Sequence, residues 1–412
     1  MKSNRSVAAA LILAALNLRL AIGAIPPVLT QVRHDTGLSS AGGGVLAALP
    51  VFCFGAAALA TPALIRRFGM RPLLSLTLVA ILAGTLLRLL SPLTALFLGT
   101  ATIGAGIAVG NVLVPGLIRR DFADRRVAMT SLYSGALCIS GAISAGLTVP
   151  LEHATGFSWR VTVGLWGVVA VVALLVWTPH ARGDRSQRES GETAALASIS
   201  GLWRDPLAWC VTAFMGLQSL GFYATLSWIP TLLENHGVGQ GQAGWLLSYS
   251  MFPSMTMALL TPSIERRLRR PVILVFAAVL LCASAYVGLL AAPASATYVW
   301  MTLLGMGQGA SLSLALGYIV ARAPDSHHAA HLSTMAQSIG YMLAAAGPFL
   351  LGWLHGATGG WTVPLLLLIG FLVPLLVAGL VASQDRFVLE RPPGSSGAGE
   401  PVWPPAPSSP SG

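Results

Sequence analysis

Asn17 and Arg19 place an amide and a permanent positive charge in the middle of an apolar stretch, residues 7–29. A charged side chain near the centre of a bilayer costs about 2.5–3.5 kcal/mol, so such a residue usually faces a water-filled cavity or a partner. A guanidinium offers planar, forked N–H donors and does not lose its charge by deprotonation. Arg19 therefore predicts a binding site for a small anion or an electron-rich polar group.

Other polar side chains also fall inside apolar stretches, and with Asn17 and Arg19 they complete the candidate substrate-binding set: Asn111, Gln218, Gln308, Gln337 and Tyr341. At about 1.5 Å per residue, Arg19, Gln218 and Gln308 come near mid-depth of the membrane. Each amide either lines a cavity or joins helices by hydrogen bonds worth about 0.6 kcal/mol. For Tyr341, as for Tyr223 and Trp228, packing is the alternative.

Acidic residues are missing from the apolar stretches. All 14 of them, and all eight histidines, fall in predicted loops, helix ends or the tail. Arg19 then has no internal carboxylate to neutralise it, and no embedded proton carrier is visible. Arg88 lies near the outer end of its apolar stretch, so its side chain can extend to the membrane surface. We favour this interpretation of Arg88.

The same pattern argues against an enzyme. No stretch contains Ser with His or a pair of carboxylates. The four cysteines occur singly in four different stretches, so neither a disulfide framework nor a zinc site is expected. We predict no metal and no cofactor.

Composition identifies the class of protein that positions these residues. Of 412 residues, 55% are hydrophobic and 9% charged, with a mean hydropathy of +0.74, whereas soluble domains carry about 25% charged residues. This composition predicts an all-α membrane protein whose partner is the lipid bilayer. Twelve apolar spans are long enough to cross it: 7–30, 41–65, 72–91, 93–118, 127–150, 160–179, 206–233, 244–264, 271–291, 297–320, 332–354 and 362–382.

Positive charge is distributed very unevenly between the two membrane faces. Twenty of the 24 Lys and Arg residues fall at one face, and only Arg33 and Arg160 at the other. By the positive-inside rule, both termini are expected in the cytoplasm of a multi-pass protein of the cell membrane. The net charge of +10 is scattered over short loops, so we predict no nucleic-acid partner.

The two halves of the chain repeat each other. Gly44, Thr61-Pro62 and Arg66-Arg67 recur 200 residues later as Gly244, Thr261-Pro262 and Arg266-Arg267, and Gly104 matches Gly305. We therefore predict two pseudo-symmetric six-helix bundles with a shared cavity between them. The predicted division is 1–180 and 206–383 for the bundles, 181–205 for a cytoplasmic linker and 384–412 for a disordered tail rich in Pro, Ser and Gly.

Twelve spans in two repeated halves resemble the major facilitator superfamily over nearly the whole chain before the tail. Residues 62–71 resemble its signature G-x-x-x-D-R-x-G-R-R, with matches at Arg67, Gly69 and Arg71. Arg66 stands where the signature has Asp, so the conformational lock implied by that Asp is not carried over. Three regions resemble the branch that contains cyanate permeases and nitroimidazole transporters: 17–21, 110–122 and 338–348.

This resemblance implies a monomeric secondary transporter that moves a small-molecule substrate by alternating access. Within that class, the uncompensated Arg19 favours a small polar or anionic solute, such as cyanate or a nitro-substituted heterocycle. An exporter of hydrophobic drugs or toxic metabolites is the alternative. A channel is disfavoured by the tandem halves and by the lack of a filter or re-entrant loop pattern.

Overall fold

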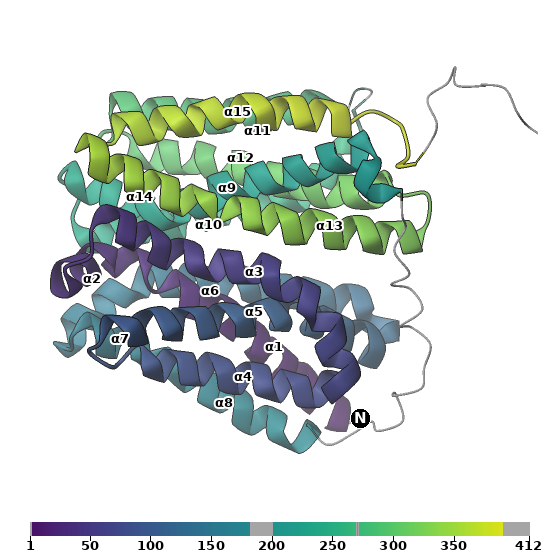
Figure 1. Cartoon of the computed structure of the whole chain (residues 1–412), viewed down its shortest axis with the longest axis horizontal. Helices are drawn as coiled ribbons and strands as arrows, with labels where there is room; N and C mark the ends of the chain where they lie inside the picture. The colour runs from purple at the N-terminus through teal and green to yellow at the C-terminus, as the bar shows by residue number, and fades with distance from the viewer. Residues whose placement is uncertain (1, 182–200, 269, 271, 390–412) are drawn as a thin grey trace, which may run out of the picture.

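The computed structural model describes residues 2–181, 201–268, 270 and 272–389, and within these ranges all regular structure is helical (Figure 1). The helices of the N-terminal half are α1 (Lys2–Gly23), η1 (Pro26–Val28), α2 (Leu29–Thr36), α3 (Ser40–Phe68), α4 (Met70–Leu87), α5 (Leu93–Asp121), η2 (Ala123–Arg125), α6 (Arg126–Thr155), α7 (Trp159–Leu165), α8 (Gly167–Trp177) and η3 (Thr178–His180). Those of the C-terminal half are η6 (Leu202–Arg204), α9 (Pro206–Asn235), α10 (Gln240–Glu265), α11 (Val272–Ala291), α12 (Thr297–Ala321), α13 (Ser326–Ala344), α14 (Ala346–Thr358) and α15 (Thr362–Ala382).

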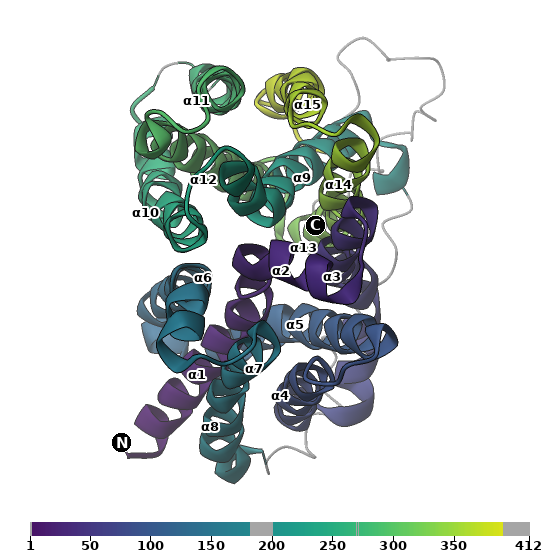
Figure 2. The ribbon, with the colours of Figure 1, turned by 90° about the vertical axis from the view of Figure 1, so that its left-hand side faces the viewer.

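The predicted bundles form two layers that lie against each other (Figures 1 and 2). In the described residues, ten helical segments are long and apolar enough to cross a membrane by themselves. The remaining two crossings are α10 and the α13–α14 pair, which match the predicted spans 244–264 and 332–354. The all-helical architecture of twelve spans in two halves is therefore confirmed.

Three of the twelve crossings are broken: 160–179 is divided at Trp166, and the other two are divided where the sequence places proline. A proline lacks an N–H and its ring clashes with the carbonyl four residues earlier, so a helix tends to end there. Helix α1 ends at Gly23, just before Pro26 and Pro27. The predicted span 332–354 is divided at Ala345, just before Pro348 in α14.

The internal repeat is visible in the packing. A side chain at Gly104 in α5 would come 2.7 Å from the Cα atom of Pro50 in α3. Its counterpart Gly305 in α12 has the same relation to Ser250 in α10, where a side chain would come 2.3 Å from the backbone oxygen. Both contacts leave no room for a Cβ atom, so glycine permits the same close helix crossing in each half.

The two ends of the molecule differ. The N-terminus and the yellow segment that follows α15 lie at one end, here called the terminal end, and α2 lies at the other, here called the α2 end (Figure 1). Hydrogen bonds between the halves gather toward the α2 end. They include Thr30 Oγ1 to Glu234 Oε2 at 2.7 Å, Gln240 Nε2 to the Pro27 oxygen at 3.1 Å, and Ser248 Oγ to the Ala142 oxygen at 2.8 Å.

At the terminal end, Arg71 pairs with Asp121 at 3.1 Å. The signature loop thus has a carboxylate partner at the end of α5, although Arg66 replaces the acidic residue within the loop itself.

The predicted linker and tail lie mostly outside the described residues, which omit 182–200 and 390–412. The described residues 384–389, at the beginning of the predicted tail, contact the C-terminal half. The Val388 N–H donates to the Arg322 oxygen at 2.9 Å, Val388 is buried, and Asp385 pairs with the Arg322 side chain at 3.1 Å. Residues 384–389 pack against the C-terminal half because that half offers both a backbone acceptor and a guanidinium there.

Candidate functional site

Arg19 lies on α1 between the two halves of the molecule. Its Nη1 atom donates a hydrogen bond of 3.3 Å to the hydroxyl of Tyr223 on α9. The hydroxyl of Tyr341 on α13 and the thiol of Cys138 on α6 are also within electrostatic range of the guanidinium. No ion pair joins Arg19 to a carboxylate in the residues that the structure describes. The positive charge is therefore surrounded by neutral donors and acceptors.

Aromatic rings bring the two halves together around this charge. Phe54 on α3 packs edge-on against Tyr223 and Tyr341, with ring centroids 6.1 and 5.8 Å apart. The two tyrosine rings lie 6.3 Å from each other. Such edge-to-face pairs contribute about 0.5–1.5 kcal/mol each beyond their buried area. The rings fix the hydroxyls near the guanidinium and make its surroundings partly apolar.

Helix α6 supplies residues that the sequence analysis missed. Tyr133 is buried and, like Cys138, lies within the electrostatic range of Arg19. A side chain at Gly141 would come 3.9 Å from the Cβ of Arg19, so the absence of one leaves room beside the arginine. Positions 138 and 141 share one helix face. A search for tyrosines inside the spans would have found Tyr133. We call Arg19, Phe54, Tyr133, Cys138, Tyr223 and Tyr341 the Arg19 cluster.

Asn17 does not face this cluster. Its Nδ2 atom donates to the Leu13 oxygen at 2.8 Å and to the Val169 oxygen on α8 at 3.3 Å, and the side chain is buried. Two residues along a helix correspond to about 200° of rotation, which points Asn17 and Arg19 in nearly opposite directions. The structure thus places Asn17 at the contact between α1 and α8.

Gln218 and Gln308 share a different cavity, inside the C-terminal half. It is a small cavity between α9, α11, α12 and α15. Gln308 Nε2 donates to the Thr225 hydroxyl at 2.8 Å, and Gln218 Nε2 donates to the Ser219 hydroxyl at 2.7 Å. Tyr286 also lines this space. We call it the amide cavity, and it is separate from the Arg19 cluster.

The two remaining predicted site residues lie elsewhere again. Asn111 is half-buried on α5. Gln337 is half-buried on α13 and donates to the Ser333 hydroxyl, one turn earlier, at 2.7 Å. Of the residues predicted from the sequence, the structure thus brings Arg19 together with Tyr341 and, in a separate place, Gln218 together with Gln308.

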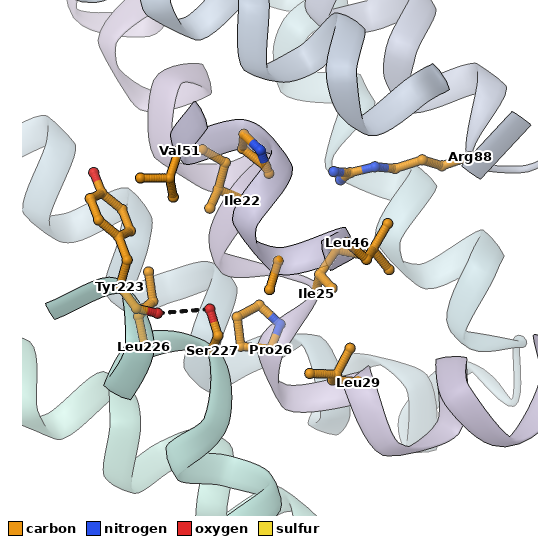
Figure 3. A pocket seen from close by; sticks show the side chains of 12 residues that line it. Ile22, Ile25, Pro26, Leu29, Leu46, Val51, Arg88, Tyr223, Leu226 and Ser227 are labelled. Atoms are coloured by element: carbon orange, nitrogen blue, oxygen red, sulfur yellow. Dashed lines mark hydrogen bonds between the residues drawn. The ribbon is translucent and has the colours of Figure 1, made fainter. Parts of the chain in front are cut away.

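Arg88 does not extend to the membrane surface as expected. It follows α4 and is 2% exposed, with Nε donating to the Thr100 hydroxyl at 3.0 Å and Nη1 donating to the Ala21 oxygen at 2.7 Å. The expected position was wrong because Ala21 belongs to the last turn of α1, whose free carbonyl groups attract a cation. Arg88 lines a second cavity between the halves, drawn in Figure 3.

Two duplicated helical halves with a polar cluster between them define a membrane transporter, not an enzyme. The sequence matches the model of the Major Facilitator Superfamily over residues 7–263 and 216–408. The chain belongs to this superfamily and is a secondary transporter with a small-molecule substrate.

Individual relatives and structures extend over nearly the whole chain. The 2-nitroimidazole transporter of Escherichia coli (strain K12) is 37% identical over 92% of this chain and 95% of its own length. The cyanate transport protein CynX of the same organism is 29% identical over 92% and 99%. Among solved structures, a bacterial homologue of the lysosomal transporter Spinster, described as inward-facing and unoccupied, has a TM-score of 0.73 at 16% identity and covers 93% of this chain and 98% of its own. The structural likeness supports the fold.

Proposed function

We propose that this transporter moves a small anionic or electron-rich polar solute, such as cyanate or a nitro-substituted heterocycle, and that Arg19 contacts it directly. The observation that carries the proposal is the environment of Arg19, a permanent cation between the two halves with tyrosine hydroxyls and no paired carboxylate in the described residues. A charge inside the membrane without a partner is costly, so a solute that brings negative charge lowers that cost when it binds. The names of the two relatives, a 2-nitroimidazole and a cyanate transporter, agree with this class of solute.

The Arg19 cluster is suited to alternating access because its members come from both halves. Arg19, Phe54 and Tyr133 belong to the N-terminal half, and Tyr223 and Tyr341 to the C-terminal half. A rocking motion of one half against the other would separate these groups on one side of the solute and then on the other. With both termini in the cytoplasm, the contacts at Thr30 and Gln240 close the external side, and they must break for the solute to exchange with the outside.

Uptake by purified full-length protein in proteoliposomes tests the role of Arg19, with labelled cyanate and 2-nitroimidazole as the two probes. Arg19→Gln removes the charge but keeps a polar side chain. It should reduce uptake of the accepted probe about tenfold or more, because a hydrogen bond to a charged group is worth about 1.5–3 kcal/mol. Arg19→Lys should retain part of the activity, since it keeps the charge but loses the forked geometry.

Arg267→Gln is the matched control. The Arg267 side chain is exposed at the terminal end and does not lie inside either half. It should transport like the unmodified protein. Equal uptake by Arg19→Gln and Arg267→Gln would refute the proposed role of Arg19. An exporter of hydrophobic drugs would instead be favoured if uptake does not depend on solute charge or membrane potential and if bulky apolar compounds are accepted.

A further inference from the structure

Arg88 uses only part of its hydrogen-bonding capacity within the protein. A guanidinium has five N–H donors. Two of its nitrogen atoms donate to the Thr100 hydroxyl and to the Ala21 oxygen. No ion pair joins Arg88 to a carboxylate in the described ranges of the chain. Arg88 therefore resembles Arg19 in being a cation whose charge the surrounding side chains do not neutralise, and it is more deeply buried than the half-buried Arg19.

A purely structural role accounts for part of this arrangement. Helix α1 stops at Gly23, so the Ala21 carbonyl belongs to the helix end, where a cation is favourable. The end of a helix carries about half a negative charge, however, against the full positive charge of arginine. The excess positive charge remains in a site that is almost completely closed to solvent.

The excess charge faces a cavity between the halves. Arg88, Tyr223 and Ser227 are the polar residues that line this small cavity. Figure 3 shows the guanidinium extending toward the end of α1 at Ile22, with Tyr223 and Ser227 of α9 on the opposite side. The remaining wall is apolar and includes Ile22, Leu46 and Val51. We call this space the Arg88 cavity.

Tyr223 links the Arg88 cavity to the Arg19 cluster. It lines the cavity and also accepts the hydrogen bond from Arg19. The cavity walls include Ile25 and Leu29, which follow Arg19 in the chain and lie closer to the α2 end. Two uncompensated cations thus lie in sequence along the interface between the halves, with one tyrosine between them.

We propose that the Arg88 cavity is a second binding position for a small, weakly hydrated monovalent anion, between the Arg19 cluster and the α2 end. This inference rests on the proposed function for one point, the identity of the solute that is transported. The cation supplies the attraction, and apolar walls favour an anion that gives up its water easily, since strongly hydrated anions pay more for burial. Because the Arg88 cavity and the Arg19 cluster share Tyr223, the anion can pass from one cation to the other as the halves move.

Thiocyanate is a suitable probe because it is stable, small, linear and weakly hydrated. Its binding to full-length protein in lipid nanodiscs would be measured by titration calorimetry, with sulfate as the strongly hydrated counterpart. The unmodified protein should bind thiocyanate in preference to sulfate. Arg88→Gln should weaken this binding at least tenfold, and Arg88→Lys should restore part of it because it keeps the charge. The loss should also appear in a protein that already carries Arg19→Gln.

Ala47→Phe provides a test that leaves the hydrogen bonds of Arg88 intact. Ala47 lines the cavity, so a larger side chain fills the space without removing the cation. This variant decides the question if Arg88→Gln fails to fold, and it should weaken thiocyanate binding as Arg88→Gln does.

The outcomes separate this inference from the proposed function. Binding that is lost in Arg88→Gln and Ala47→Phe but kept in Arg19→Gln supports the Arg88 cavity, whereas the role of Arg19 is tested separately by the uptake of Arg19→Gln. Binding that depends on Arg19 alone overturns the inference and leaves the proposed function standing. Absence of thiocyanate binding to the unmodified protein, or equal binding of sulfate, also overturns it.

Discussion

The Arg19 cluster and the amide cavity are both polar regions inside a membrane protein, yet they are built differently. The cluster draws on α1, α3 and α6 of one half and on α9 and α13 of the other. The amide cavity lies within the C-terminal half, and its glutamines are satisfied by hydroxyl groups of α9 at 2.7 and 2.8 Å. Arg19 has a single longer hydrogen bond, of 3.3 Å, to Tyr223.

This difference separates polar residues that hold helices together from those that can meet a solute. In alternating access, groups that bind the solute must lie where the two halves separate. Side chains that bond each other within one half move as a unit and can stay paired throughout. We therefore propose that the Arg19 cluster binds the solute and that Gln308 joins α12 to α9.

Charge reversal at Arg19 should have the largest effect. Arg19→Glu replaces attraction by repulsion in a site with little water, where each unit charge interaction at 4 Å is worth about 4 kcal/mol. Affinity for a transported anion should fall by about a hundredfold or more. Equilibrium binding to the full-length protein, with thermal unfolding as the check on folding, measures this. An Arg19→Glu protein that is folded and still binds the anion normally would break the comparison.

Removal of the Tyr223 hydroxyl should have an intermediate effect. Tyr223→Phe keeps the ring packing against Phe54 but removes the oxygen that accepts from Arg19. A net hydrogen bond contributes about 0.5–1.5 kcal/mol, so solute affinity should fall about threefold to tenfold. Tyr249→Phe is the matched control, because its hydroxyl bonds Thr302 within the C-terminal half at 3.0 Å. Equal losses in the two variants would argue against a specific role for Tyr223.

Gln308→Leu should have the smallest effect on transport. It removes the hydrogen bond to Thr225 but leaves the interface between the halves unchanged. Such a bond contributes about 0.6 kcal/mol in a membrane, which corresponds to a fall in Tm of about 1–2 °C. Uptake should stay within about twofold of that of the unmodified protein. A twofold change corresponds to about 0.4 kcal/mol. A loss of uptake as large as that of Tyr223→Phe would show that the amide cavity takes part in transport.

The fold could be predicted well because the sequence signals for it are strong and can be read along the chain without knowledge of tertiary contacts. Apolar runs of membrane length gave all twelve crossings, and the 200-residue repeat gave the two halves. The same reasoning identified Arg19, since an arginine in an apolar run is conspicuous without any knowledge of its neighbours. It did not predict the packing of residues 384–389 against the C-terminal half, because the contact between Val388 and Arg322 joins segments distant in the chain.

The candidate site was only partly predictable. Gln218 and Tyr223 come from one helix and from similar depths, yet five residues rotate them about 140° apart, so they enter different cavities. Asn17 and Arg19 are separated in the same way. Tyr133 and Cys138 were both missed as site residues, although both lie in the predicted span 127–150.

The sequence by itself determined the membrane class, the crossings, the duplication and the embedded cation at Arg19. These follow from the free energy of placing each residue in a bilayer, which depends on residue type and position along the chain. Tertiary structure alone decided that Arg88 is buried beside α1 and that the tyrosines of three helices gather around Arg19. Those facts depend on the rotation of each helix about its axis, which is fixed by the packing of neighbouring helices.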